Sequence, residues 1–148
     1  MPAYICPVCS EPMDRHQRQW RCPANHSYDE AREGYVNLLL PNQKHSRDPG
    51  DNADMLRARR EFLETGLYRF MPEEIVDIVN RHSNGLPRGK NALDIGSGEG
   101  FYTAYFAEHL KNFHWQGIDI SKAGVRMAAK RYPGADFAVQ RVDQRTIQ

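Results

Sequence analysis

Apolar and polar positions follow a repeating order over residues 91–139. Short apolar runs with the length of buried strands occur at 92–95, 115–120 and 137–139. The segments between them, 101–110 and 122–132, have the pattern of helices. Strands and helices in alternation predict a parallel sheet with right-handed crossovers, in which ligands bind at the carboxyl ends of the strands.

Residues 41–84 predict a helical connector in front of this unit. A first amphipathic helix is expected to run from a cap at Asp51 or Asn52 to about residue 65. A second is expected from Pro72 to about residue 82, with an apolar face that would pack on a sheet. Further upstream, the apolar residues 35–40 are expected to form a short strand or a buried segment.

A glycine-rich turn joins the first predicted strand of the repeating unit to its helix. Gly96, Gly98 and Gly100 allow the backbone to turn sharply and to approach a ligand closely, where a side chain would collide with it. Asp119 lies at the end of the second strand, where an acidic residue accepts hydrogen bonds from ribose hydroxyls. The turn therefore predicts a nucleoside-binding site.

Spacing and charge favour one class of nucleoside over another. Dinucleotide folds carry the fingerprint G-x-G-x-x-G, whereas here the third glycine comes one residue early and position 101 is Phe. Asp94, on the strand before the turn, and Glu99, within it, would oppose a pyrophosphate. S-adenosylmethionine is cationic and has no phosphate, so it is the favoured ligand. A dinucleotide site and a turn without a ligand stay open as alternatives.

All three cysteines of the chain lie in its first 22 residues. They form the pairs Cys6-x2-Cys9 and Cys22-x3-His26, which are separated by a segment with turn signals and a strand-like 19–21. Two short-spaced pairs brought together by a hairpin can supply the four ligands of a tetrahedral zinc ion. Four protein ligands leave no open position, so a structural ion is expected. His16 is a rival fourth ligand, and a set of buried cysteines without metal is the alternative.

The composition is that of a globular chain with no overall excess of positive charge, which does not exclude an RNA partner. The 148 residues are 40% hydrophobic and 26% charged, with a formal net charge of +1. Local positive charge occurs at Arg15, Arg18 and Arg21, which would either contact RNA or form a solvated face. Neither a run of about 20 apolar residues nor a secretory signal occurs, so the expected location is the cytoplasm and no membrane partner is expected.

Specific motifs in both halves resemble one known family. The chain is similar to the bacterial large-subunit (23S) ribosomal RNA guanine-N1 methyltransferases, which carry a zinc module ahead of a Rossmann-type domain. The matching stretches are CPVC, CPANH, EGYVNLL, SRDPGD, ARREFLETGLY, LDIGSGEGFYT, GIDISK and AAKRYP. They cover residues 6 to about 137, and a methyltransferase of another family would match only the glycine turn and the Asp119 region.

The resemblance implies an α/β fold, a site and an activity. It implies a zinc-binding module at 1–40, the connector at 41–84 and the first half of a Rossmann-like domain, with an incomplete parallel sheet, at 85–148. Cys6, Cys9, Cys22 and His26 match the family's zinc ligands, and Tyr68, Tyr102 and Thr103 match positions that contact S-adenosylmethionine beside the loop glycines. The implied reaction is methylation of a guanine N1 in an rRNA hairpin, which the zinc module and the methyltransferase cleft hold together. The residue that would accept the N1 proton is not identified.

Residues 140–148 depart from the family pattern. They contain no long apolar segment and no further helix, so the sheet is expected to stop at three strands with an open edge. A C-terminally truncated family member is therefore expected, with the methyltransferase activity as the leading hypothesis. A zinc-containing RNA-binding remnant without catalysis is the second hypothesis. The sequence leaves the oligomeric state open, a homodimer included.

Overall fold

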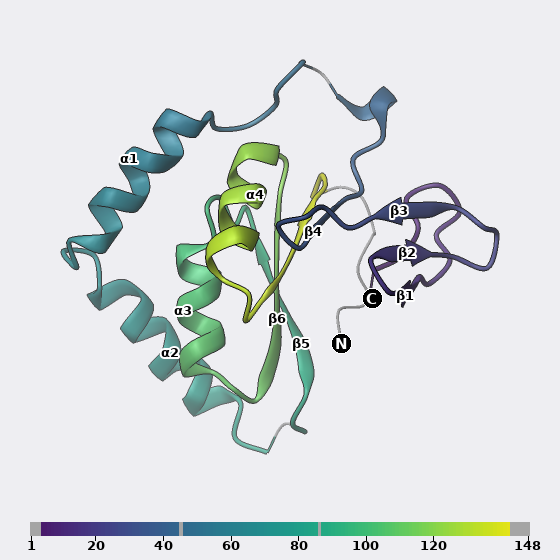
Figure 1. Cartoon of the computed structure of the whole chain (residues 1–148). Helices are drawn as coiled ribbons and strands as arrows, with labels where there is room; N and C mark the ends of the chain where they lie inside the picture. Colours follow the sequence, from purple (N-terminus) through teal and green to yellow (C-terminus); the bar gives the residue numbers. More distant parts are fainter. Residues whose placement is uncertain (1–3, 45, 86, 143–148) are drawn as a thin grey trace.

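Two sheets and four α-helices make up the computed structural model, which describes residues 4–44, 46–85 and 87–142 (Figure 1). The small sheet has the antiparallel order β1-β2-β3, formed by Asp14–His16, Gln19–Arg21 and Ser27–Asp29. The large sheet has the order β4-β7-β6-β5, and each neighbouring pair is parallel. Its strands are β4 (Tyr35–Asn37), β5 (Lys90–Ile95), β6 (Phe113–Asp119) and β7 (Asp136–Val139).

The predicted strand–helix alternation is confirmed. Helix α3 (Phe101–His109) connects β5 to β6, and α4 (Lys122–Arg131) connects β6 to β7. The Ser121 side chain caps α4 by accepting a hydrogen bond from the Gly124 amide at 3.1 Å. Because β5, β6 and β7 are parallel, the turn after β5 and the residues after β6 lie at the same edge of the sheet.

Strand β4 was not predicted to join this sheet. It pairs with the outer edge of β7, with Tyr35 opposite Phe137 and Asn37 opposite Val139. The expectation of a three-stranded sheet is therefore wrong, because a segment from the N-terminal part covers the edge of β7. Within the described residues, β5 forms the other edge and pairs only with β6.

The connector contains the two expected helices, α1 (Ala53–Glu64) and α2 (Phe70–His82), after a short 3-10 helix (Pro41–Gln43). Of the two predicted caps for α1, Asn52 holds the position, and its side chain accepts hydrogen bonds from the amides of Asp54 and Met55, both at 3.0 Å. Helix α2 begins at Phe70, two residues before the predicted start. No helix in the described part of the chain combines the length and apolar character needed to cross a membrane.

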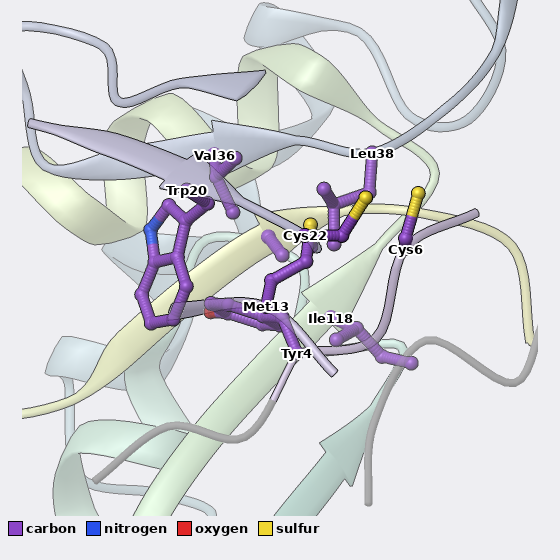
Figure 2. Close-up of a cluster of buried hydrophobic side chains, with 9 residues drawn as sticks. Tyr4, Cys6, Met13, Trp20, Cys22, Val36, Leu38 and Ile118 are labelled. Carbon is purple, nitrogen blue, oxygen red and sulfur yellow. The ribbon is translucent and has the colours of Figure 1, made fainter. Parts of the chain in front are cut away.

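The two faces of the large sheet are covered by different layers (Figure 1). Helices α3 and α4 lie on one face, where Val125, Ala128 and Ala129 of α4 pack with Phe137 and Val139 of β7. Helix α2, which was expected to pack on a sheet, packs mainly on α3, and α1 packs on α4. The N-terminal module with the β1–β3 sheet lies on the other face, and its apolar residues share one buried cluster with residues in or next to the large sheet (Figure 2). This cluster consists of Tyr4, Cys6, Met13, Trp20 and Cys22 together with Val36, Leu38, Ile118 and Ala138.

Leu38→Ala tests whether this shared core couples the two sheets. Leu38 is fully buried, so the cavity is expected to cost about 2–5 kcal/mol of unfolding free energy. Denaturant unfolding followed by tryptophan fluorescence reports on both sheets, through Trp20 in β2 and Trp115 in β6. Val8→Ala, at an exposed position, is the matched control. Separate transitions for the two tryptophans in the native chain would contradict the coupling.

Candidate functional site

Four side chains of the N-terminal module converge on one point. The Sγ atoms of Cys6 and Cys22 lie 3.5 and 3.4 Å from Nδ1 of His26, and the Sγ atoms of Cys9 and Cys22 are 3.6 Å apart. All four ligand atoms lie within 4.8 Å of one another. Tetrahedral zinc with Zn–S and Zn–N bonds of ordinary length separates its ligand atoms by about 3.6–3.8 Å. The set therefore fits a structural zinc ion.

Two tight turns place these ligands. In the first, the Ser10 amide donates to the Cys6 carbonyl at 2.8 Å, and in the second the Asn25 amide donates to the Cys22 carbonyl at 2.9 Å. Ser10 and Asn25 have φ angles of 61° and 64°, the left-handed conformation that closes each turn. His16, the rival ligand, lies on exposed β1 and is outside the cluster.

The environment of Cys6 favours its thiolate. Burial raises the pKa of the thiol, but hydrogen bonds from the backbone amides of Cys9 and Val8 and from the Tyr28 hydroxyl lower it to about 7. Because zinc binds the deprotonated sulfur, this environment prepares Cys6 as a ligand near neutral pH.

A second group of functional residues gathers at the carboxyl ends of β5 and β6. The amides of Gly96 and Ser97 donate to the Ile118 carbonyl at 2.9 and 3.0 Å, which holds the glycine-rich turn against β6. Gly100 has a φ of 86°, and a Cβ there would lie 2.6 Å from Cβ of Ala128. The turn therefore needs glycine at this position for both its conformation and its packing against α4.

Asp119 holds the turn and the start of α4 together. Its Oδ2 accepts a hydrogen bond from the Gly98 amide at 2.9 Å, and its Oδ1 accepts one from the Ser121 amide at 2.7 Å. A carboxylate has about four lone-pair positions, so it retains the capacity to accept from ligand hydroxyls. The residue predicted to bind ribose is thus in a fixed orientation.

Asp94 is held by a residue that was expected to contact the ligand itself. Thr103 is fully buried, and its hydroxyl donates to Oδ2 of Asp94 at 2.6 Å. Burial raises the pKa of Asp94, the Thr103 hydrogen bond lowers it, and the nearby charge of Asp119 raises it. The structure therefore places Thr103 behind Asp94, where it orients the carboxylate.

Glu99 was expected to oppose a pyrophosphate, but the structure pairs its charge inside the protein. Its side chain is 2% exposed, with Oε2 2.8 Å from Nε of Arg60 and Oε1 accepting from the Phe101 amide at 3.1 Å. Arg60 also donates to the Glu99 carbonyl at 3.2 Å and lies over the ring of Tyr132. The negative charge available at the turn is that of Asp94 and Asp119.

Two cavities flank the turn and share Gly96. One, of about 380 Å³, is lined by Arg59, Phe62, Leu63, Tyr68, Asp94, Gly96, Ser97, Glu99, Phe101 and Tyr102. The other, of about 510 Å³, is lined by Gly96, Ile118, Asp119, Ile120, Gln140, Arg141 and Val142. Tyr68 and Tyr102 thus lie in the first cavity with Asp94, and Asp119 lies in the second.

Comparison with known proteins matches both parts of the chain. Residues 4–47 match a family model described as RlmA, N-terminal, a zinc ribbon, and residues 92–148 match a methyltransferase domain model. A 23S rRNA (guanine(748)-N(1))-methyltransferase from Streptomyces fradiae is 34% identical over 90% of this chain and 46% of its own length. A putative 23S rRNA (guanine-N(1)-)-methyltransferase from Micromonospora griseorubida is 33% identical over 94% of this chain and 51% of its own length.

Residues 4–47 therefore carry a zinc ribbon of the RlmA type, and residues 92–148 carry a methyltransferase domain. The chain spans about half the length of the curated relatives that it matches. Among solved structures, a TehB-like SAM-dependent methyltransferase from Corynebacterium glutamicum aligns with 63% of this chain and 48% of that chain, at 22% identity and a TM-score of 0.49.

Helix α1 contributes residues of the candidate site, although the sequence analysis assigned this helix only to a connector. Arg59, Phe62 and Leu63 line the first cavity, and Arg60 holds Glu99. The apolar stripe of α1 was visible in the sequence, but its partner was not. Arg59 and Arg60, beside that stripe, were the signal in the sequence that could have indicated a role of α1 in the site.

Cys22→Ser tests the metal centre. The variant is expected to lose bound zinc, whereas the native chain should carry one ion and His16→Ala should retain it, because His16 is outside the cluster. Elemental analysis of purified protein measures the stoichiometry. Loss of zinc from His16→Ala would contradict the assignment of the ligands.

Arg60→Ala tests the ion pair beneath the glycine-rich turn. Removal of the guanidinium leaves the Glu99 carboxylate buried without its partner, which is expected to cost about 3–5 kcal/mol of unfolding free energy. Arg57→Ala is the matched control on the same helix, since its pair with Asp54 is exposed and is expected to contribute about 0.5 kcal/mol or less. Equal losses in the two variants, measured by denaturant unfolding, would contradict the role of Arg60.

Proposed function

We propose that this chain binds S-adenosylmethionine across the Gly96–Gly100 turn. The observation that carries the proposal is the pair of carboxylates, Asp94 and Asp119, near the ends of adjacent parallel strands, in two cavities that both have Gly96 in their lining. The second cavity suits the nucleoside, because Asp119 can accept hydrogen bonds from ribose hydroxyls.

The first cavity suits the amino-acid half of the donor. Its lining includes Asp94 and Arg59, which complement an ammonium and a carboxylate respectively, whereas the charge of Glu99, also in the lining, is paired with Arg60. Tyr68 and Tyr102 provide its aromatic walls. A pyrophosphate would lie beside Asp94 and Asp119, so a dinucleotide fits this charge arrangement less well.

The reaction that we propose is methyl transfer to N1 of a guanine in large-subunit ribosomal RNA. Its support is the activity for which the relatives are named, together with the RlmA-type zinc ribbon at residues 4–47. Bound S-adenosylmethionine supplies a methyl group on a sulfonium, whose positive charge disappears on transfer. The protein would contribute mainly alignment of donor and acceptor, and a group that we do not assign would remove the N1 proton.

The partner that we propose is an RNA hairpin, in the cytoplasm. It would contact a basic surface of the zinc ribbon. Arg15, Arg18 and Arg21 surround one hollow of the β1–β2 hairpin together with His16, Gln17 and Gln19. The guanidinium groups are held by Glu30, by the Ala31 carbonyl and by Gln19. Such anchored cations can contact phosphates without first losing side-chain freedom.

The alternative function is RNA binding through the zinc ribbon without turnover. The observation that favours it is the hollow of the β1–β2 hairpin that Arg15, Arg18 and Arg21 line. Calorimetry with S-adenosylmethionine and transfer of its tritiated methyl group to unmodified 23S rRNA separate the two functions. Donor binding with transfer supports the methyltransferase, and RNA binding with neither donor binding nor transfer supports the alternative.

Thr103→Val tests the role of the Asp94 charge in donor binding. The ammonium of the donor needs an ionised Asp94, so affinity is expected above the pKa of Asp94 and lost as the pH falls through it. Valine removes the hydrogen bond that lowers this pKa, so the loss is expected at a higher pH than in the native chain. Dissociation constants measured by calorimetry over an acidic pH series provide the readout.

Two further variants complete this test. Asp94→Asn is expected to weaken donor binding about tenfold or more at neutral pH, because a hydrogen bond to a charged partner is lost. Asp54→Asn, on the exposed surface of α1, is the control and should leave affinity unchanged. Identical pH profiles for the native chain and Thr103→Val would exclude the proposed role of Asp94.

A further inference from the structure

Exposed aromatic side chains gather where α1 leads into α2. Phe62, Tyr68 and Phe70 are 45%, 47% and 64% exposed. Their rings form a row, with centroid distances of 5.4 Å from Phe62 to Tyr68 and 5.5 Å from Tyr68 to Phe70. We call these three residues the aromatic ridge.

The aromatic ridge continues directly from the first cavity. Phe62 and Tyr68 line that cavity together with Asp94 and Gly96, whereas Phe70 lies outside it at the first turn of α2. The row of rings therefore leads from the proposed donor position to the molecular surface. An acceptor that approaches the methyl group from this side would pass over the ridge.

Cationic side chains flank the same row. Arg59 lines the cavity and makes a long ion pair with Asp51, at 3.7 Å, and Arg69 precedes Phe70 and pairs with Glu73 at 2.9 Å. The side chains of both arginines are more than half exposed. Aromatic faces between exposed guanidinium groups are the combination by which proteins hold unpaired nucleotides, through stacking and phosphate contacts.

We propose that the aromatic ridge is a stacking surface for unpaired bases of the acceptor RNA. The proposal rests on the proposed function, since N1 lies on the Watson–Crick edge of guanine and is reached only when the base is unpaired. An unpaired guanine with its neighbours needs apolar faces to replace the stacking that it loses. Tyr68 would stack nearest the donor, and Phe70 would stack an adjacent base.

Substitutions at Phe70 separate stacking from general apolar contact. Phe70→Ala is expected to weaken binding of an RNA hairpin about tenfold, as the loss of one base–aromatic stack does. Phe70→Leu, which keeps apolar bulk without a ring, should be equally weak, and Phe70→Tyr should bind as the native chain does. Ile78→Ala is the matched control, since Ile78 is an exposed apolar residue of α2 outside the ridge.

The probe is an RNA hairpin with 2-aminopurine at an unpaired loop position, because stacking quenches the fluorescence of this base. Its titration gives the affinity, and calorimetry with S-adenosylmethionine is run on each variant. The expected result is weaker RNA binding and less quenching for Phe70→Ala and Phe70→Leu, with unchanged donor affinity. A fully paired duplex of the same sequence should be insensitive to all four variants.

Two results would overturn the inference. The first is equal RNA affinity and quenching in the native chain and Phe70→Ala while the native chain still binds the donor, which would leave the proposed function intact. The second is a combination of two findings. The Phe70 variants retain RNA binding, and sedimentation shows concentration-dependent self-association of the native chain that Phe70→Ala abolishes and Phe70→Leu keeps. That outcome would assign the ridge to a second copy of the chain. Failure of the native chain to bind the donor would count against the proposed function instead.

Discussion

The structure depends on one hydrophobic core that two different sheets share. Strand β4 makes this possible because its side chains alternate, with Val36 facing the zinc ribbon and Tyr35 facing α4. Two of the metal ligands, Cys6 and Cys22, are themselves members of the shared core. The metal centre thus holds in place a layer that covers one face of the parallel sheet, and the ion's contribution to folding extends beyond the small module.

The candidate donor site lies at the carboxyl ends of β5 and β6 in the same sheet. There the glycine-rich turn is held from three directions, by the Ile118 carbonyl, by the Asp119 carboxylate and by the Arg60–Glu99 ion pair. The last contact joins residues far apart in the sequence and ties α1 to the turn. The connector therefore also forms one wall of the first cavity, beside the glycine-rich turn.

These contacts also explain the distribution of charge around the turn. Of the acidic side chains near it, Glu99 is neutralised inside the protein by Arg60, whereas Asp94 and Asp119 remain beside the cavities. A buried carboxylate requires a partner, and α1 supplies it. The remaining two carboxylates are oriented by different groups. Thr103 orients Asp94, and the backbone amides of Gly98 and Ser121 orient Asp119.

The sequence by itself predicted the local features: the two pairs of metal ligands with His16 as a rival, the strand–helix alternation after residue 90, a helix cap at Asp51 or Asn52, and the positions of the loop glycines. Each follows from spacing or conformation within a short stretch, which requires no knowledge of distant partners. Only the tertiary structure decided that β4 joins β7, that Arg60 neutralises Glu99, that Thr103 lies behind Asp94 and that α1 lines the cavity. These are contacts between residues remote in sequence, and their partners are selected by the packing of one element on another, which no local pattern encodes.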